Sequence, residues 1–187
     1  MRVLGIDPGT VTTGWGVVEE RGTKLFRVAG GIVRARGPLA ERLGYIFGEI
    51  EVVIARSAPA AVSLEKNFVA ANVQSAFRLG EARGAVLAAA ARAGVTVAEY
   101  SPAEIKLAVT GTGRATKEQM QTMVRRLLSL RDSVTNDEAD ALGAAICHLY
   151  GRRFAERVGS ASVVALVRAR RRRVGRRWNP TTVVPLR

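Results

Sequence analysis

The order of hydrophobic patterns along the chain constrains its fold more than any other feature of the sequence. Short apolar or alternating runs bounded by Gly, Pro or charged residues are typical of strands. Three such runs precede the first helical pattern, and two more then alternate with helices. The strands are expected at residues 2–7, about 12–19, about 24–33, 60–65 and 95–99. This order, β-β-β-α-β-α-β-α-α-α, predicts an α/β protein with a mixed five-stranded sheet flanked by helices.

Helices are indicated by apolar residues spaced three or four apart. After Gly37-Pro38, one helical face collects Leu39, Leu43, Ile46, Phe47 and Ile50. A long Ala-rich helix over about 69–92 carries a stripe of Val69, Val73, Phe77, Gly80, Gly84 and Leu87.

Capping sequences predict where the last three helices begin. Ser101-Pro102-Ala103-Glu104 has the spacing of a capping box with Pro at the first helical position. Thr116 is expected to cap the next helix. Thr135 and Glu138 match a second capping box, which opens a helix that runs to about residue 151.

The positive charge of the chain is concentrated at its C-terminal end. The formal net charge is +13, and residues 151–187 hold eleven Arg and one Glu, a net of +10. We therefore expect a globular domain over 1–153 and an Arg-rich C-terminal tail over 154–187. A basic tail of this kind favours binding to nucleic acid or, less often, to an anionic membrane surface.

Composition excludes several classes of protein. The chain is 48% hydrophobic, which is enough for a packed core, but no apolar run approaches the roughly 18 residues of a membrane span. One cysteine, Cys147, and one histidine, His148, exclude a disulfide framework and a multi-cysteine zinc site, and both are assigned to structure. Because the N-terminus also has no signal-peptide pattern, we expect a cytoplasmic protein with no membrane partner.

Four carboxylates stand at strand ends and helix starts, where functional groups gather in sheet-based folds. Asp7 ends the first strand and Glu65 ends the fourth, while Asp137 and Asp140 share one face of the last helix. Each also has an ordinary explanation: a turn residue before Pro-Gly, a solvated strand end, or a complement to the helix dipole. Asp140 is the hardest to explain in that way, because its neighbours in ADALGAA are small and apolar.

Five sequence blocks, in register over about 150 residues, resemble a known family. They are GIDPGT-x-x-TGWG over 5–16, Leu64-Glu65 followed by Phe68, RLGEARG over 78–84, GTGRATK over 111–117 and DEADALGAAICH over 137–148. Together they resemble the RuvC-type Holliday-junction resolvases. The resemblance implies a ribonuclease H-like fold and a metal-dependent crossover junction endodeoxyribonuclease that acts in DNA recombination and repair.

By the same resemblance, Asp7, Glu65, Asp137 and Asp140 are the catalytic, metal-binding carboxylates. Two unit charges about 4 Å apart repel by roughly 4 kcal/mol at an effective dielectric near 20, so four gathered anions require cations or raised pKa values. We expect two Mg²⁺ ions per subunit, with Mn²⁺ as the alternative. One would supply hydroxide for in-line attack and the other would stabilise the departing 3′ oxygen, which leaves a 5′-phosphate and a 3′-hydroxyl.

Four further residues are expected to contact DNA. In the family, lysines at the places that match Lys106 and Lys117 approach the scissile phosphate, and Arg114 in the Gly-rich loop is a further phosphate contact. Phe68 matches an aromatic residue that stacks on bases at the crossover, which is worth roughly 1–3 kcal/mol for each base. The alternatives are solvated surface lysines and a Phe68 that packs in the core as a hydrophobic staple.

The resemblance also implies partners. They are a four-way DNA junction, a second copy of the chain in a homodimer that cuts opposite strands, and the RuvA and RuvB branch-migration complex. Small residues such as Ala76, Gly80 and Gly84 would permit close helix packing in a dimer. They suit a core equally well.

Three other functions fit parts of the pattern. An actin-like sugar kinase or ATPase has a first phosphate loop similar to DPGTVTTGWG, but that class uses two such domains and this chain is too short for both. A catalytically inert DNA-binding module would use the carboxylates only to shape its surface. A nuclease that cuts RNA–DNA hybrids would share the fold, and a cleavage assay that compares junction, hybrid and linear duplex separates the two.

We predict that the tail adds salt-dependent, sequence-independent DNA affinity, because arginines that neutralise phosphates release counterions. Truncation after Arg153 is expected to flatten the slope of log affinity against log salt concentration by about 0.9 for each phosphate that the tail neutralises. Fluorescence anisotropy with a labelled junction measures this slope. An unchanged slope would exclude the role.

Overall fold

The structure of the protein is a computed structural model that describes residues 1–66, 73–132 and 134–158. Its contacts divide the chain into two units, Met1–Gly151 and Arg152–Arg187. Of the second unit, residues 152–158 are described, and they form the end of the last helix. Phe68 and the predicted tail from residue 159 onward lie outside the described residues.

The helices and strands follow one another in the predicted order. They are β1 (Arg2–Asp7), β2 (Thr12–Arg21), β3 (Lys24–Arg34), α1 (Leu39–Ser57), β4 (Ala61–Glu65), α2 (Val73–Arg92), β5 (Thr96–Tyr100), α3 (Pro102–Thr110), α4 (Lys117–Leu127) and α5 (Asn136–Val158). The capping box predicted from Ser101 opens α3, and Thr116 caps α4 as predicted and also forms a capping box with Gln119. Among the described residues, no helix combines the length and apolar character that crossing a membrane requires.

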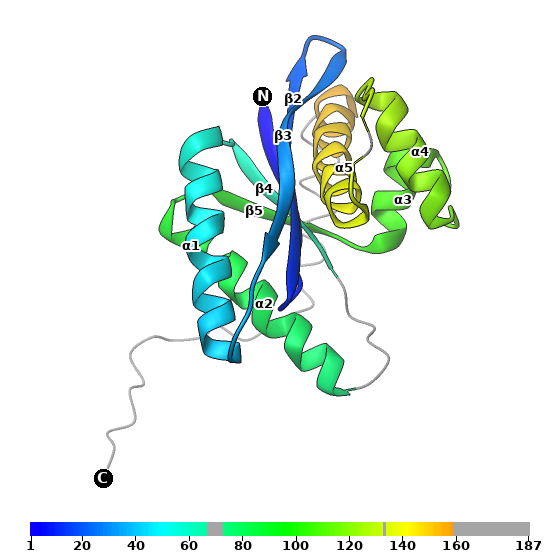
Figure 1. Cartoon of the computed structure of the whole chain (residues 1–187). Coiled ribbons are helices and arrows are strands. Elements are labelled where there is room, and N and C mark those ends of the chain that lie inside the picture. Colours follow the sequence, from blue (N-terminus) through cyan, green and yellow to red (C-terminus); the bar gives the residue numbers. More distant parts are fainter. Residues whose placement is uncertain (67–72, 133, 159–187) are drawn as a thin grey trace, which may run out of the picture. The chain divides into compact units, whose positions relative to one another are not determined.

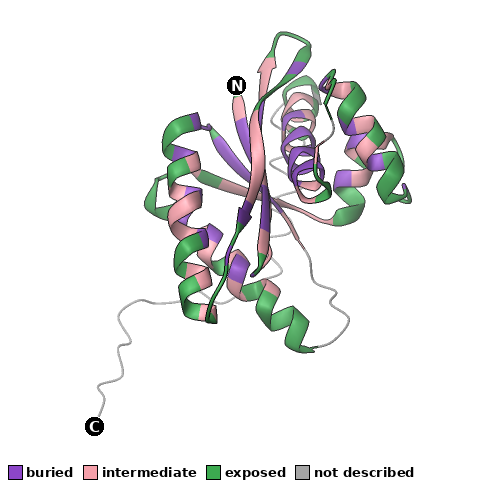
Figure 2. Cartoon of the chain, in the orientation of Figure 1, coloured by how far each residue is buried: buried purple, intermediate pink, exposed green. Residues whose placement is uncertain are grey.

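All five strands belong to one sheet, in the order β3-β2-β1-β4-β5. β1 pairs antiparallel with β2 and parallel with β4, so the sheet is mixed as predicted. Helices α1 and α2 cover one face, and α3, α4 and α5 cover the other (Figure 1). Because side chains alternate across a strand, Val3 packs in the core under α3–α5 and Leu4 in the core under α1 and α2. Figure 2 shows the buried residues gathered between these layers.

A row of small residues crosses the whole sheet beneath α5. The strand register places side by side Gly30, Gly16, Gly5, Ser63 and Ala98 of β3, β2, β1, β4 and β5. A Cβ added at Gly5 would overlap the carbonyl oxygen of Ala141, and one at Gly16 would stand 2.6 Å from the side chain of Leu142. The row therefore lets the helix backbone lie closer to the sheet than ordinary side chains allow.

One stripe of α5 contacts successive strands of the sheet. Its first residue, Asp137, lies over Gly14 of β2, where a Cβ would overlap the Asp137 carbonyl oxygen. Further along, the carbonyl oxygen of Ala144 accepts a hydrogen bond of 2.7 Å from the buried Ser63 hydroxyl of β4. With the helical spacing i, i+4, i+7 and i+11, the stripe consists of Asp137, Ala141, Ala144 and His148.

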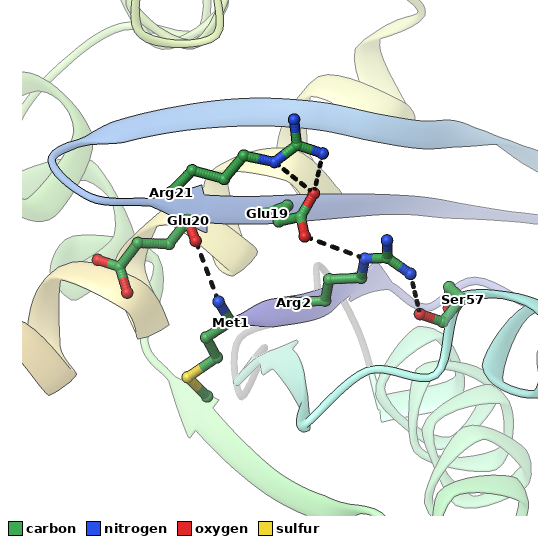
Figure 3. A network of polar contacts seen from close by, with 6 residues as sticks. All are labelled: Met1, Arg2, Glu19, Glu20, Arg21 and Ser57. Carbon is green, nitrogen blue, oxygen red and sulfur yellow. Dashed lines mark hydrogen bonds and ion pairs between the residues drawn. The ribbon is translucent and has the colours of Figure 1, made fainter.

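Polar contacts close the end of the sheet where β1 begins (Figure 3). Glu19 of β2 accepts a hydrogen bond of 2.9 Å from Nε of Arg21 and forms an ion pair of 3.5 Å with Nε of Arg2. The hydrogen bond from Arg21 holds the pKa of Glu19 below its ordinary value. Arg2 also donates to the carbonyl oxygen of Ser57 at the end of α1. This end of the sheet is therefore occupied by structural ion pairs.

Helix α5 is longer than predicted. It continues to Val158 instead of ending at about residue 151. Gly151 does not take the positive φ that ends many helices. The next turn carries an ion pair of 2.5 Å between Arg152 and Glu156, four residues apart, which favours its helical form.

Helix α2 buries a different face from the predicted stripe. Its buried residues are Ala82, Val86, Ala89 and Ala90. Within this chain Val73 is 72% exposed and Phe77 is 70% exposed. A Cβ at Gly80 or Gly84 would meet nothing within 4 Å. The small residues Gly80 and Gly84 therefore do not serve packing against the described residues of this chain.

We predict that Gly5→Ala lowers the free energy of unfolding by at least about 3 kcal/mol, the upper range for an overpacked core, because the new methyl group overlaps the backbone of α5. The matched control is Gly44→Ala on α1, where a Cβ meets nothing within 4 Å and the helix gains up to about 1 kcal/mol. Urea denaturation measures both. Equal stability of the two variants would contradict the close approach of α5.

Candidate active site

Asp7 and Glu65 leave the sheet at adjacent points. β1 and β4 are parallel neighbours whose register runs up to Ile6 opposite Leu64. Asp7 and Glu65 are the next residues after this pair, so both lie where β1 and β4 end, on the same side of the sheet. Both side chains are half-buried.

Asp137 and Asp140 lie in the first turns of α5. The helix begins where the sequence predicts, and the Thr135 hydroxyl accepts a hydrogen bond of 3.3 Å from the N–H of Glu138. The Glu138 carboxylate was predicted to return to the helix start and complete the capping box. Instead it accepts a hydrogen bond of 2.7 Å from Nε of Arg27 on β3, and the residue is 6% exposed. This partly buried ion pair joins the first turn of α5 to the edge strand of the sheet.

Lys117 reaches the same place from the start of α4. Its Nζ lies 3.2 Å from Oδ2 of Asp140. Burial opposes the charge of the ammonium group, but Asp140, and then Asp137 and Asp7, raise the pKa of Lys117 overall. The lysine is therefore held by the carboxylate cluster as its counter-charge.

The pKa of the Asp7 carboxyl group is strongly raised. Burial has the largest effect on its pKa, and the charges of Glu65, Asp140 and Asp137 add to it, against an opposing effect of Lys117. Together they raise the pKa of Asp7 from 3.8 to about 7. Because three other carboxylates act on Asp7, the structure brings together the four acidic residues that the sequence singled out.

A cleft of about 320 Å³ opens beside the carboxylates. Its charged lining consists of Glu65, Asp140, Lys106 and Lys117, and its apolar lining consists of Pro102, Ile105 and Met120. A larger depression of about 650 Å³ lies between α1 and the turn before β5, but Glu51 is its one charged residue. The smaller cleft is therefore the one that can support chemistry on a phosphate ester.

Of the other two predicted DNA contacts, the structure describes Arg114. Arg114 is exposed in the loop before α4 and is not among the lining residues, and its N–H donates to the Thr112 hydroxyl. Phe68 lies outside the described residues.

Two side-chain contacts at the edges of the site were not predicted from the sequence. One is the Arg27–Glu138 ion pair, and the other is a contact of 2.9 Å between the Tyr100 hydroxyl and Nδ1 of His148. The partners are 111 and 48 residues apart in the chain. No local pattern relates residues at such separations. The one available signal is that His148 interrupts an otherwise apolar stretch.

The donor set fits a hard divalent cation. Carboxylates supply oxygen ligands, which Mg²⁺ and Mn²⁺ prefer. Part of the rise in the pKa of Asp7 comes from the charges of the other three carboxylates, and a bound cation would relieve this repulsion. In residues 1–66, 73–132 and 134–158, no three His, Cys, Asp or Glu side chains already converge as a ligand set. Binding would therefore require the carboxylates to rotate toward one another.

A mixed five-stranded sheet, with carboxylates at the ends of two central strands and at the start of a helix across them, is typical of ribonuclease H-like nucleases. The family model of "Crossover junction endodeoxyribonuclease RuvC" matches residues 3–148. The chain belongs to the RuvC family. The family predicted from the sequence is thereby confirmed.

Individual relatives agree with this assignment. The RuvC of Burkholderia multivorans is 45% identical over 177 residues, which cover 94% of this chain and 98% of that protein. The RuvC of an Anaeromyxobacter species is 49% identical over 168 residues, which cover 89% and 79%. The solved structure "T. thermophilus RuvC in complex with Holliday junction substrate" aligns with a TM-score of 0.79 and 38% identity, over 83% of this chain and 96% of that one. The ribonuclease H-like fold is confirmed as well.

We predict that Asp7 destabilises the cation-free protein at neutral and alkaline pH. Its pKa of about 7 in the folded protein lies above the ordinary 3.8, so between these values the folded state binds more protons than the unfolded state. The free energy of unfolding therefore falls as the pH rises through this window. The Asp7→Asn variant carries no charge at this position and should be more stable than wild type at pH 8 by on the order of 2–4 kcal/mol, since one pKa unit corresponds to about 1.4 kcal/mol. Near pH 4 the variant should lose this advantage.

Urea denaturation in EDTA at pH 4 and pH 8 measures this difference. Asp132→Asn, which removes an exposed carboxylate, is the matched control and should change little at either pH. An Asp7→Asn protein that is no more stable than wild type at pH 8 would contradict the electrostatic strain at Asp7.

Proposed function

We propose that the protein is a structure-selective, metal-dependent endonuclease that resolves Holliday junctions in DNA recombination and repair. It makes paired symmetric nicks and leaves 5′-phosphate and 3′-hydroxyl ends. The observation that carries the proposal is the meeting of Asp7, Glu65, Asp137 and Asp140 at one edge of the sheet in a chain of the RuvC family. The Holliday junction bound in the structure of the T. thermophilus relative supports the choice of substrate.

The same four carboxylates are the proposed catalytic, metal-binding residues. They would hold two Mg²⁺ ions per subunit, with Mn²⁺ as the alternative, because their oxygen donors and mutual repulsion suit hard divalent cations. When bound, such cations supply a nucleophile from water at neutral pH and stabilise the leaving oxygen. The buried ends of β1 and β4 and the first turns of α5 supply the rigid backbone from which the carboxylates are presented.

Lys106 and Lys117 are proposed to bind the scissile phosphate. Both line the cleft beside Glu65 and Asp140, and Lys117 stands at a helix start, which favours anions. The Lys117 side chain is 51% exposed while its Nζ contacts Asp140. It is therefore free to turn from the carboxylate toward a phosphate when DNA enters the cleft.

The contact with DNA is proposed to extend beyond the cleft. Arg114 would bind a backbone phosphate from its exposed loop, and Phe68 would stack on bases at the crossover. We also propose a nuclease domain over 1–153 followed by a DNA-binding tail over 154–187. Because the described part of α5 runs to Val158, truncation after Val158 removes residues 159–187 and keeps the described helix.

The protein is proposed to act as a homodimer whose two sites cut opposite strands. Support comes from α2, where Val73 and Phe77 stand one turn apart and are exposed, next to Gly80 and Gly84 with open space above them. Exposed apolar stripes of this kind are typical of self-association surfaces. The family resemblance adds the RuvA and RuvB branch-migration complex as partner and the cytoplasm as location.

We predict that Asp7→Ala abolishes Mg²⁺-dependent junction cleavage. Loss of a ligand that removes several kcal/mol of transition-state stabilisation lowers the rate by roughly 100-fold or more. Asp132→Ala, which removes an exposed carboxylate, should cleave as wild type does. Cleavage that survives in Asp7→Ala would contradict the catalytic role of Asp7. A wild-type protein that binds junctions but never cuts them would point to the inert DNA-binding module.

We further predict that the wild-type protein prefers four-way junctions to RNA–DNA hybrids and linear duplexes. Equal amounts of the three substrates, each with its own label, compete in one cleavage reaction with Mg²⁺. Faster cleavage of the RNA–DNA hybrid would show that the proposed substrate is wrong, although the protein would still be a nuclease.

A further inference from the structure

Tyr100 is fastened to the backbone at Glu65. The two residues are register partners at the ends of β5 and β4. The N–H of Lys66, the next residue after Glu65, donates a hydrogen bond of 2.7 Å to the carbonyl oxygen of Tyr100. A displacement of Tyr100 therefore also displaces the end of β4 from which Glu65 projects.

The side chain of Tyr100 joins this strand end to α5. Its hydroxyl lies 2.9 Å from Nδ1 of His148, and the two rings meet edge to face with centroids 6.0 Å apart. Burial, and then the charges of Cys147 and Glu104, raise the pKa of Tyr100 to about 12. The hydroxyl and Nδ1 share one hydrogen bond, and the tautomer of His148 decides which of the two atoms donates.

His148 belongs to the stripe of α5 that begins at Asp137. Eleven residues, about three helical turns or roughly 16 Å, separate the two. Since α5 is one continuous helix, the contact at His148 limits how far the helix can slide or turn over β5. Asp137 and Asp140 would share any such movement.

We propose that Tyr100 and His148 are positioning residues that set the separation between Glu65 and the aspartates of α5. The inference rests on the proposed function, because that separation matters when the carboxylates share cations. Between the two edge strands, α5 packs on the row of small residues and accepts the Ser63 hydrogen bond at Ala144. The Arg27–Glu138 ion pair anchors the helix at β3, and the Tyr100–His148 hydrogen bond anchors it at β5.

The test compares variants that remove this hydrogen bond. Tyr100→Phe keeps the ring and removes only the hydroxyl, whereas His148→Leu removes the imidazole and with it both the hydrogen bond and the edge-to-face ring contact. Both should raise the Mg²⁺ concentration for half-maximal junction cleavage by about tenfold, the lower range for residues that orient metal ligands. They should also reduce the rise in Tm that Mg²⁺ produces, and leave junction affinity in EDTA unchanged.

Two variants serve as controls. His148→Gln retains an acceptor for the Tyr100 hydroxyl and should restore the Mg²⁺ requirement of the wild type. Tyr45→Phe removes a hydroxyl from a 51% exposed tyrosine on α1 and should change nothing.

The outcomes separate this inference from the proposed function. If Tyr100→Phe lowers stability but keeps the wild-type Mg²⁺ requirement, the contact is structural and the inference is wrong. If Tyr100→Phe fails to fold, equal Mg²⁺ requirements in His148→Leu and His148→Gln would overturn it. A wild-type protein that neither cuts junctions nor gains stability from Mg²⁺ would overturn the proposed function itself.

Discussion

The close packing of α5 on the sheet is the constraint on which the rest of the structure depends. Gly5, Gly16 and Gly30 carry no side chain where the helix passes, and larger residues at these places would collide with it. The helix therefore lies low enough for its first turns to reach the edge where β1 and β4 end. A sheet with ordinary side chains would hold the helix several ångströms higher, and its aspartates would stand away from Asp7.

This arrangement destabilises the cation-free protein electrostatically. Burial, and then the charges of three neighbouring carboxylates, raise the pKa of Asp7 to about 7, so the cation-free fold has to tolerate a buried and repelled carboxyl group. Lys117 offsets part of it through its ion pair with Asp140. Natural sites often sacrifice stability in this way, because a cluster that is strained alone is complementary to the charge it binds. The ion pairs at the opposite end of the sheet, centred on Glu19, are by contrast satisfied within the protein (Figure 3).

The contacts that hold the site are of two kinds: some join residues close together in the sequence, and others join residues far apart in it. Ser101 and Thr116 make capping boxes with residues three positions away, and such local geometry can be predicted from sequence. Glu138 has the same local spacing from Thr135, yet its carboxylate pairs with Arg27 of β3. The charge-assisted hydrogen bond from Arg27 is stronger than a capping bond at an exposed helix start. Arg27 lies 111 residues away from Glu138 in the chain, so no local rule could predict it. The local rule was therefore right about where the helix begins and wrong about what Glu138 does.

The sequence by itself determined the order of strands and helices, the family, and the four acidic residues of the candidate site, because periodicity and motifs are properties of neighbouring residues. Tertiary structure alone decided which side chains meet. It pairs Tyr100 with His148, leaves Val73 and Phe77 of α2 exposed, and explains Gly5, Gly14 and Gly16 of the GIDPGT-x-x-TGWG block as space for α5. The physical reason is that these contacts depend on how far apart the packed layers lie, and that distance is set by side chains from every part of the chain at once.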